Sequence, residues 1–285
     1  MIRGWYRAMM TGMQTIIDSE MRRFEGFALA AALDWLIGCA QRAPRHLLCL
    51  GLHLARGEAD GERRAETHAD WHAALAWADA DPAALTSEAD RHRAARFVRP
   101  ADAARHLLGR AMVRRLHRTL AGTAGPPAWP VNAWGKPESV AGGPVFNLSH
   151  SGAEIWLIAS PVGKVGIDVE FEYPQLDALR PLLHAAELAD LGAAPPPQAL
   201  RRLWARKEAV VKALGTGLSA PLDGFRVAVD DRRRQWLLAA PTAASGPWLC
   251  FDLEVACSAG GDAARSVAAC DTAGPVAVRL AVVTG

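Results

Sequence analysis

The sequence predicts a mixed protein of the α+β class, and three observations support this prediction. Helical and strand-like hydrophobic patterns alternate along most of the 285 residues. Hydrophobic residues make up 51% of the chain and charged residues 22%, which is ordinary for a globular protein and excludes disordered, collagen-like and coiled-coil chains. Strands and helices recur in both halves, although residue identities do not repeat. This recurrence is compatible with a duplicated α/β architecture, at a length that allows one large domain or two ordinary ones.

The first segment, residues 1–66, differs from the remainder. Helical patterns cover residues 9–24 and 27–37, and a charged run at 56–66 has the composition of a linker. We therefore interpret residues 1–66 as an N-terminal extension, which is either inert or, through Trp5, Trp35 and the flanking arginines, a helix that binds a membrane or a partner.

The remaining elements follow from hydrophobic period and from turn residues. The segment at 87–96 has a helical pattern with Ser87 as its N-cap, and 102–120 forms a second amphipathic helix. Two further helices are expected at 181–191 and 200–214, separated by three consecutive prolines. Strands are expected at 145–148, 155–160, 165–171, 224–229, 236–239, 248–255 and 276–283.

Charge and cysteine content exclude several functional classes. A net charge of +2 disfavours a broad nucleic-acid surface but leaves room for a local phosphate site. The five cysteines are scattered and form no C-x-x-C pair, which disfavours a disulfide framework or a zinc site. The most apolar stretch, 26–40, is short and interrupted by Asp34, and no cleavable signal is visible. We expect a cytoplasmic protein without integral membrane association.

A pair of acids lies in the strand Gly166-Ile167-Asp168-Val169-Glu170. Alternate residues of a strand share a face, so Asp168 and Glu170 point the same way while Ile167 and Val169 point into the core. Two like charges on one face repel unless a cation lies between them, and carboxylate oxygens suit Mg²⁺. By itself, however, the pair fits a solvent-exposed strand edge better.

The helix at 200–214 adds a glutamate and two lysines. Glu208 and Lys212 lie one turn apart, which is typical of a solvent-exposed ion pair but would also supply a third carboxylate and an ammonium for phosphate. Only four of the 32 Lys and Arg residues are lysine. Three of these four, Lys136, Lys207 and Lys212, fall within the segments that carry candidate site residues, which suggests a need for a compact ammonium.

Polar residues also end the strand Phe146-Asn147-Leu148-Ser149-His150-Ser151-Gly152. His150 and the Ser149 hydroxyl can donate hydrogen bonds to a phosphate, although an ordinary surface histidine remains an alternative. Upstream, Gly135-Lys136-Pro137 forms a tight turn that exposes a lysine.

The order and spacing of these segments resemble the 4′-phosphopantetheinyl transferases, and most of all the monomeric surfactin-synthetase-activating type. The resemblance rests on G-K-P, F-N-x-S-H-S-G, G-I-D-V-E, W-x-x-K-E-A-x-x-K and the following Gly215-Thr216-Gly217-Leu218. It is dense between residues 87 and 229 and looser from residue 71 to the C-terminus.

The resemblance implies a function. Such enzymes move the 4′-phosphopantetheine arm of coenzyme A, as co-substrate, onto a serine of an apo acyl or peptidyl carrier protein and release 3′,5′-ADP. They use Mg²⁺, with Mn²⁺ as an alternative, and serve polyketide, nonribosomal peptide or fatty acid biosynthesis. The resemblance also implies a monomer with two similar α/β subdomains, here 67–163 and 164–285, and the active site in the cleft between them.

Site residues follow from the matching positions. Asp168, Glu170 and Glu208 would hold the metal, and Glu208 would also accept the proton of the attacking serine. Lys212 would contact the transferred phosphoryl group, with Lys207 nearby and Glu187 near the metal. Asp90 stands where the family has lysine. The positions matched to coenzyme A contacts are Arg91, Arg93, Arg105, Gly135, Lys136, Pro137, Ser149 and His150.

Two alternatives remain. The chain could bind coenzyme A or a carrier protein without transfer, although the complete set of acids and lysines argues against decay. It could also act only on a fatty-acid carrier, like the small trimeric synthases, although the duplicated length argues against this.

Overall fold

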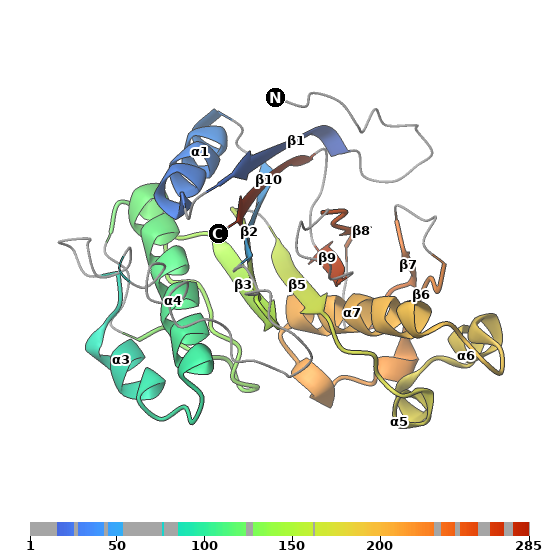
Figure 1. Cartoon of the computed structure of the whole chain (residues 1–285). Coiled ribbons are helices and arrows are strands. Elements are labelled where there is room, and N and C mark those ends of the chain that lie inside the picture. Colours follow the sequence, from blue (N-terminus) through green and yellow to red (C-terminus); the bar gives the residue numbers. More distant parts are fainter. Residues whose placement is uncertain are drawn as a thin grey trace.

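The computed structural model has a mixed α+β fold, as the sequence predicts (Figure 1). Its strands form a five-stranded sheet in the order β1-β10-β2-β4-β3, a three-stranded sheet β5-β9-β8 and a small β6-β7 pair. The structure describes residues 16–25, 28–42, 45–53, 76, 85–123, 128–161, 163–230, 235–242, 246–255, 263–270 and 276–284.

The five-stranded sheet combines both ends of the chain. Its strands are β1 (Ile16–Phe24), β10 (Val276–Thr284), β2 (His46–His53), β4 (Glu154–Ser160) and β3 (Val145–Ser151). β1 and β2 both run parallel to β10, and β4 runs antiparallel to its neighbours β2 and β3. The helices of this part are α1 (Leu29–Arg42), α3 (Glu88–Ala94) and α4 (Pro100–Ala121).

The C-terminal sheet is antiparallel and is covered by one long helix. It contains β5 (Lys164–Glu170), β9 (Ala264–Cys270) and β8 (Trp248–Asp252), and the helix is α7 (Pro197–Leu214). The shorter elements are α5 (Leu176–Leu179), η1 (Arg180–Leu182), α6 (Ala185–Leu191), η2 (Gly217–Ser219), η3 (Leu222–Gly224), β6 (Arg226–Val227) and β7 (Leu237–Ala239).

The sheets and helices lie in layers, because alternate side chains of β2 and of β9 pack on opposite faces of their sheets. On β2, Leu48 and Leu50 pack with α1 and α4, whereas Leu47 and Cys49 face the three-stranded sheet. On β9, Val267 and Ala269 face the five-stranded sheet, whereas Ala268 and Cys270 pack in the cluster that contains α7. The order of layers is therefore helices, five-stranded sheet, three-stranded sheet and α7.

The contact between β5 and α7 is unusually close because residue 166 is glycine. A Cβ atom at Gly166 would lie 2.1 Å from the carbonyl oxygen of Ala209 and 2.4 Å from the amide nitrogen of Ala213. Only a residue without a side chain fits there, and the approach brings the even-numbered residues of β5 against α7.

The N-terminal segment differs from the helical expectation. Residues 16–24 form strand β1 instead of a helix, and residues 46–53 form β2 between β10 and β4. The helix expected at 27–37 is confirmed by α1. The expected linker at 56–66 lies outside the described residues. Pairing with β10, from the far end of the chain, decides the conformation of β1, and no local pattern contains that information.

Most other elements match their predictions, with differences at proline and in short strands. α7 begins at Pro197, because the missing N–H of proline is not needed in the first helical turn. Residues 181–191 divide into part of η1 and α6. The strand expected at 224–229 shortens to β6, and β9 was not predicted. In the described part of the chain, no helix has both the length and the apolar character needed to cross a bilayer.

Candidate functional site

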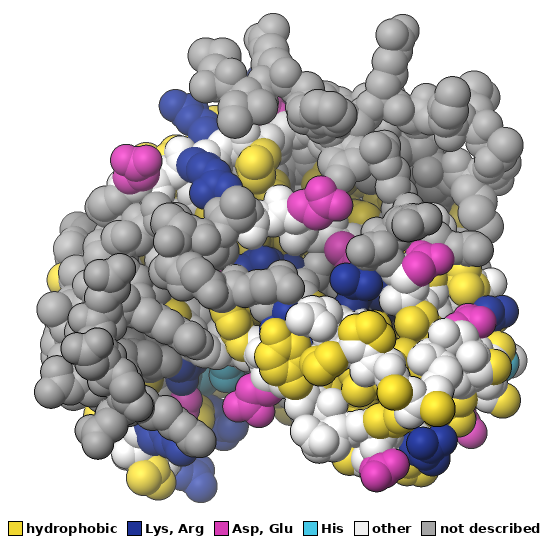
Figure 2. All heavy atoms as spheres, turned by 45° about the vertical axis from the view of Figure 1, so that its right-hand side comes forward, with side chains coloured by type: hydrophobic (Ala, Val, Ile, Leu, Met, Phe, Trp, Pro, Cys, Tyr) yellow, Lys and Arg dark blue, Asp and Glu magenta, His cyan; other side chains and the backbone are white. Residues whose placement is uncertain are grey.

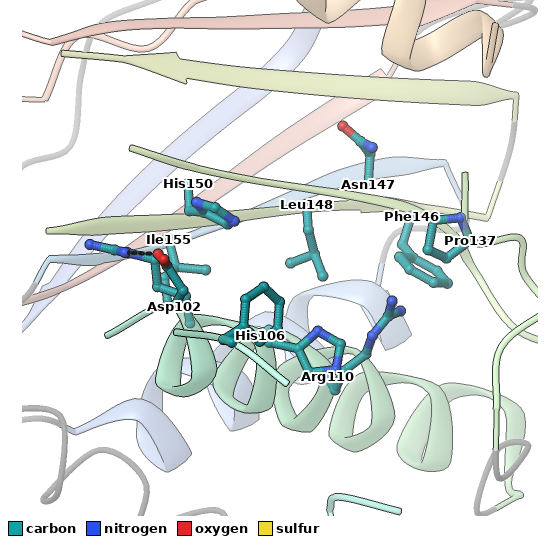
Figure 3. A pocket seen from close by; sticks show the side chains of 12 residues that line it. Asp102, His106, Arg110, Pro137, Phe146, Asn147, Leu148, His150 and Ile155 are labelled. Atoms are coloured by element: carbon teal, nitrogen blue, oxygen red, sulfur yellow. Dashed lines mark hydrogen bonds and ion pairs between the residues drawn. The ribbon is translucent and has the colours of Figure 1, made fainter. Parts of the chain in front are cut away.

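Strand β3 separates two groups of candidate residues. Phe146 and Leu148 point toward α4, whereas Asn147 points to the opposite side (Figure 3). On that opposite side, the Ser149 hydroxyl donates to Asp168 of β5 over 3.0 Å. The motif that ends β3 therefore borders a pocket on one side and the carboxylates of β5 on the other.

The carboxylates are arranged as the strand alternation predicts. Ile167 and Val169 are buried between the sheets, and Asp168 on the other face bonds to Lys212 of α7. The Lys212 ammonium lies 2.5 Å from Oδ1 of Asp168 and 3.1 Å from Oγ of Ser149. The second oxygen, Oδ2 of Asp168, is buried and has no hydrogen-bond partner among the described residues.

Burial raises the pKa of all three candidate metal ligands, and the charge of neighbouring acids adds to the effect at Glu170 and Glu208. Burial raises the pKa of Asp168, although Lys212 and Ser149 oppose the shift. Burial raises the pKa of Glu170, and the charge of Asp168 adds to the effect. At Glu208, burial again raises the pKa; Lys212 opposes the shift, whereas Asp168 and Glu170 reinforce it. The charge of Asp168 thus reaches both Glu170 and Glu208, which indicates that the three acids lie near one another.

The carboxylates of Asp168, Glu170 and Glu208 are suitable ligands for a hard cation. The unpartnered Oδ2 of Asp168 and the repulsion among the acids are both relieved by a bound cation, and Mg²⁺ prefers oxygen ligands. The described residues nevertheless contain no group of three or more His, Cys, Asp or Glu side chains placed to hold a metal ion. In this arrangement Lys212 donates to Oδ1 of Asp168.

A pocket of about 260 Å³ lies between α4 and β3 (Figure 3). Arg105 is fixed at its wall, because Nη1 donates to Asp102 over 2.6 Å and Nη2 donates to the Gly152 carbonyl over 2.6 Å. His150 also lines the pocket, and its pKa is lowered by burial and by the nearby charges of Arg105 and Lys212. Pro137, from the loop before β3, also lines the pocket.

Two further basic residues line this pocket. Nε2 of His106 and Nη1 of Arg110 are buried and have no hydrogen-bond partner in the part of the chain that the structure describes. The pKa of His106 is lowered by burial and then by the charge of Arg110. Neither residue was predicted from the sequence, although Asp102, His106 and Arg110 recur at intervals of four and therefore share a helix face. Their donors suit an anion.

The arginines expected upstream have different surroundings. Arg91 donates to the Thr86 carbonyl over 2.8 Å and so supports the turn before α3, while Arg93 is exposed. Asp90, in place of the family lysine, forms a capping box with Ser87 and lies 2.9 Å from Arg114. Neither Arg91 nor Arg93 lines the pocket.

The Gly135-Lys136-Pro137 turn is tied to α7. The Lys136 ammonium donates to the Lys212 carbonyl over 2.5 Å and to the Val165 carbonyl over 3.1 Å. Burial lowers the pKa of Lys136 to about 8. Gly135 provides the positive φ of 82° that the turn requires. The Lys136 side chain thus joins the loop to β5 and α7 and does not enter the pocket.

Lys207 and Glu187 lie away from these groups. The Lys207 ammonium is fully buried, 2.8 Å from Oε2 of Glu187, and donates to the carbonyls of Leu222 and Phe225. Oε1 of Glu187 accepts the Val227 N–H over 2.7 Å. The structure therefore does not bring Lys207 or Glu187 to the carboxylates of β5.

The comparisons with known proteins agree with one another. The family model of the 4′-phosphopantetheinyl transferase superfamily matches residues 164–270. A 4′-phosphopantetheinyl transferase of Bacillus subtilis is 34% identical over 157 residues, covering 52% of this chain and 68% of that protein. The transferase Sfp of Bacillus subtilis strain 168 is 34% identical over 145 residues, covering 48% and 63%.

A further relative covers a shorter segment at higher identity. The 4′-phosphopantetheinyl transferase AcpT of Salmonella typhimurium is 46% identical over 89 residues, which are 28% of this chain and 46% of that protein. The first Bacillus subtilis protein is matched over more than two thirds of its length, which is enough to assign the family of this chain. It belongs to the 4′-phosphopantetheinyl transferase superfamily and is a phosphopantetheinyl transferase.

Proposed function

We propose that this chain transfers the 4′-phosphopantetheine arm of coenzyme A to a serine of an apo acyl or peptidyl carrier protein and releases 3′,5′-ADP, with Mg²⁺ required. The observation that carries the proposal is the arrangement around β3. A basic pocket lies on one side of this strand, and three coupled acids with a lysine lie on the other.

The pocket is the proposed site for the nucleotide part of coenzyme A. Arg105 and His150 offer donors for its phosphates, and Pro137 supplies an apolar surface for its base. Gly135, Lys136 and Ser149 support this site, because their hydrogen bonds and turn geometry fix the walls around it. Figure 2 shows dark-blue basic and magenta acidic side chains intermixed on the described part of one face. We propose no nucleic-acid partner.

Asp168, Glu170 and Glu208 would hold the Mg²⁺ (or Mn²⁺). When bound, this ion neutralises charge on the diphosphate that links the arm to 3′,5′-ADP. The raised pKa of Glu208 suits it to accept the proton of the carrier serine, directly or through water. The serine oxygen then forms a bond to phosphorus as the bond to 3′,5′-ADP breaks.

Lys212 is the proposed contact of the transferred phosphoryl group. Its side chain is 26% exposed, so the ammonium can leave Asp168 and reach an incoming ligand. We do not assign Lys207 to this contact, because its ammonium is enclosed and already has three partners.

We further propose that the active site lies in a cleft between two related subdomains of a cytoplasmic monomer. The expected division near residue 163 coincides with the connection from β4 to β5, where the chain passes from the five-stranded to the three-stranded sheet. Because β10 returns to the five-stranded sheet beside β1 and β2, the first subdomain would include both ends of the chain.

The test is an intact-mass measurement on an apo carrier protein incubated with the purified chain, coenzyme A and Mg²⁺. We expect a gain equal to one phosphopantetheine arm, lost when a chelator is added and restored by excess Mg²⁺. No gain on several acyl and peptidyl carriers, with coenzyme A binding still measurable, would contradict transfer and favour a non-catalytic binding protein.

A further inference from the structure

Strands β3 and β5 meet as the edges of two different sheets. The outer edge of an edge strand carries backbone N–H groups without strand partners, which usually need water or another group. Here the partners are side chains of β3. Oδ1 of Asn147 accepts the Ile167 N–H over 2.9 Å, and Oγ of Ser149 accepts the Val169 N–H over 3.3 Å.

A third hydrogen bond continues the series. Oγ of Ser151 accepts the Phe171 N–H over 3.2 Å, and in every case the donor lies 20 residues after the acceptor. The constant offset means that alternate side chains of β3 match alternate N–H groups of β5 and of Phe171, the residue that follows it. We call Asn147, Ser149 and Ser151 the β3 ladder. It replaces backbone pairing at the junction of the two sheets.

The two serines of the β3 ladder have a second contact that Asn147 lacks. Each hydroxyl accepts a backbone N–H, from Val169 in β5 or from Phe171 directly after it, and donates to a carboxylate of β5. Ser149 donates to Oδ1 of Asp168 over 3.0 Å, and Ser151 donates to Oε1 of Glu170 over 3.2 Å. A hydroxyl can accept an N–H and still donate its one proton, so each serine can bond to the backbone and to a carboxylate at the same time.

We propose that the β3 ladder positions the carboxylates of β5, with Ser151 as the positioning residue for Glu170 and Ser149 for Asp168. This inference rests on the proposed metal role of these acids. A hydrogen bond to one carboxylate oxygen sets the orientation of the group and leaves the other oxygen available for a cation, as outer-shell groups do around metal ligands. The unpartnered Oδ2 of Asp168 has this arrangement.

Ser151 gives the sharper test, because its hydroxyl joins the Phe171 N–H to Glu170 and, unlike that of Ser149, does not also contact Lys212. We expect S151A to weaken binding of Mn²⁺ to the protein without coenzyme A by about 10-fold, the lower end for removal of an outer-shell partner. The measurement is the electron paramagnetic resonance signal of free Mn²⁺ in a titration. The KM for coenzyme A at saturating Mg²⁺ should stay near that of the unaltered chain. S151T, which keeps the hydroxyl, should restore Mn²⁺ binding.

Asn147 provides the matched control within the same ladder. N147A also removes one side-chain contact to a β5 N–H, so it should lower the melting temperature about as much as S151A. The Asn147 oxygen bonds to backbone and not to a carboxylate, so N147A should leave Mn²⁺ affinity unchanged. Equal loss of Mn²⁺ affinity in N147A and S151A, or no loss in S151A, would overturn the positioning role. If the unaltered chain itself binds no Mn²⁺, the proposed metal site fails, and the inference fails with it.

Discussion

Helix α7 carries two lysines that each bind a carboxylate, and the two pairs differ in how completely they are satisfied. In the Lys207–Glu187 pair both side chains are 0% exposed, and both carboxylate oxygens of Glu187 have partners. In the Lys212–Asp168 pair the lysine is 26% exposed, and one oxygen of the buried carboxylate has no partner among the described residues. A pair with all its donors and acceptors in use holds the fold, whereas a pair with a spare oxygen beside solvent can bind a ligand.

The geometry of the helix explains the difference. Successive residues turn by about 100°, so Lys207 and Lys212 project about 140° apart around α7, whereas Glu208 and Lys212 project only about 40° apart. Lys212 therefore shares a face with Glu208 toward β5, and Lys207 points to the segment that contains η3 and Phe225. The two lysines belong to one sequence motif but have different surroundings.

Removing Asp168 should give the largest effect. We expect D168A, like E208A, to abolish transfer, a loss of at least about 10³-fold or about 4 kcal/mol in the barrier. The fold should remain, because loss of either acid relieves repulsion and the exposed part of Lys212 lets its ammonium turn to water. Intact-mass assays and urea unfolding measure the two effects. Full Mg²⁺-dependent turnover in either variant would remove the metal assignment.

Removing the Glu187 carboxylate should lower stability and leave transfer intact. E187A leaves the Lys207 ammonium buried without its counter-charge, and we expect the free energy of unfolding to fall by about 3–5 kcal/mol. Urea unfolding followed by tryptophan fluorescence gives this value. Any residual folded E187A should still transfer, because neither Glu187 nor Lys207 faces the carboxylates of β5.

A double variant provides the control for E187A. Replacing the pair together, as E187L with K207M, removes both charges and should recover much of the lost stability. A double variant as unstable as E187A would show that the contacts of Lys207 with the Leu222 and Phe225 carbonyls matter more than the ion pair.

These differences mark the limit of prediction from sequence. The alternation in β5 placed Asp168 and Glu170 on one face correctly, because strand period is a local property. The environment of Lys207 depends on the packing of η3, and strand β1 depends on β10 at the other end of the chain. Such contacts join distant segments, and a single sequence does not contain their geometry. His106 and Arg110 could have been predicted from the sequence, because their spacing of four places them on one face of α4.

The buried carboxylate of Glu154 extends the comparison, because its pKa shift makes stability depend on pH. Glu154 is 1% exposed and lies beside Arg265, with the Trp156 Nε1–H donating to it over 2.6 Å. Burial acts to raise the pKa of Glu154, as it does for Asp168, but here the hydrogen bonds from His53, Arg265 and Trp156 prevail and lower it to about 2. A buried carboxylate with enough hydrogen-bond donors around it is therefore stabilised in its charged form.

The sign of the pH effect follows from this lowered pKa. Between the ordinary value of 4.5 and about 2, the unfolded chain binds a proton that the folded chain does not. Stability from Glu154 is therefore complete above about pH 5 and is lost as the pH falls toward 2, by about 3 kcal/mol. We expect urea midpoints of the unaltered chain to fall across this range. E154Q should be less stable at about pH 6 and should show a shallower decline on acidification, since it has no carboxylate to protonate. Parallel declines in both proteins would mean that other carboxylates govern acid stability and that the donors around Glu154 do not hold its charge.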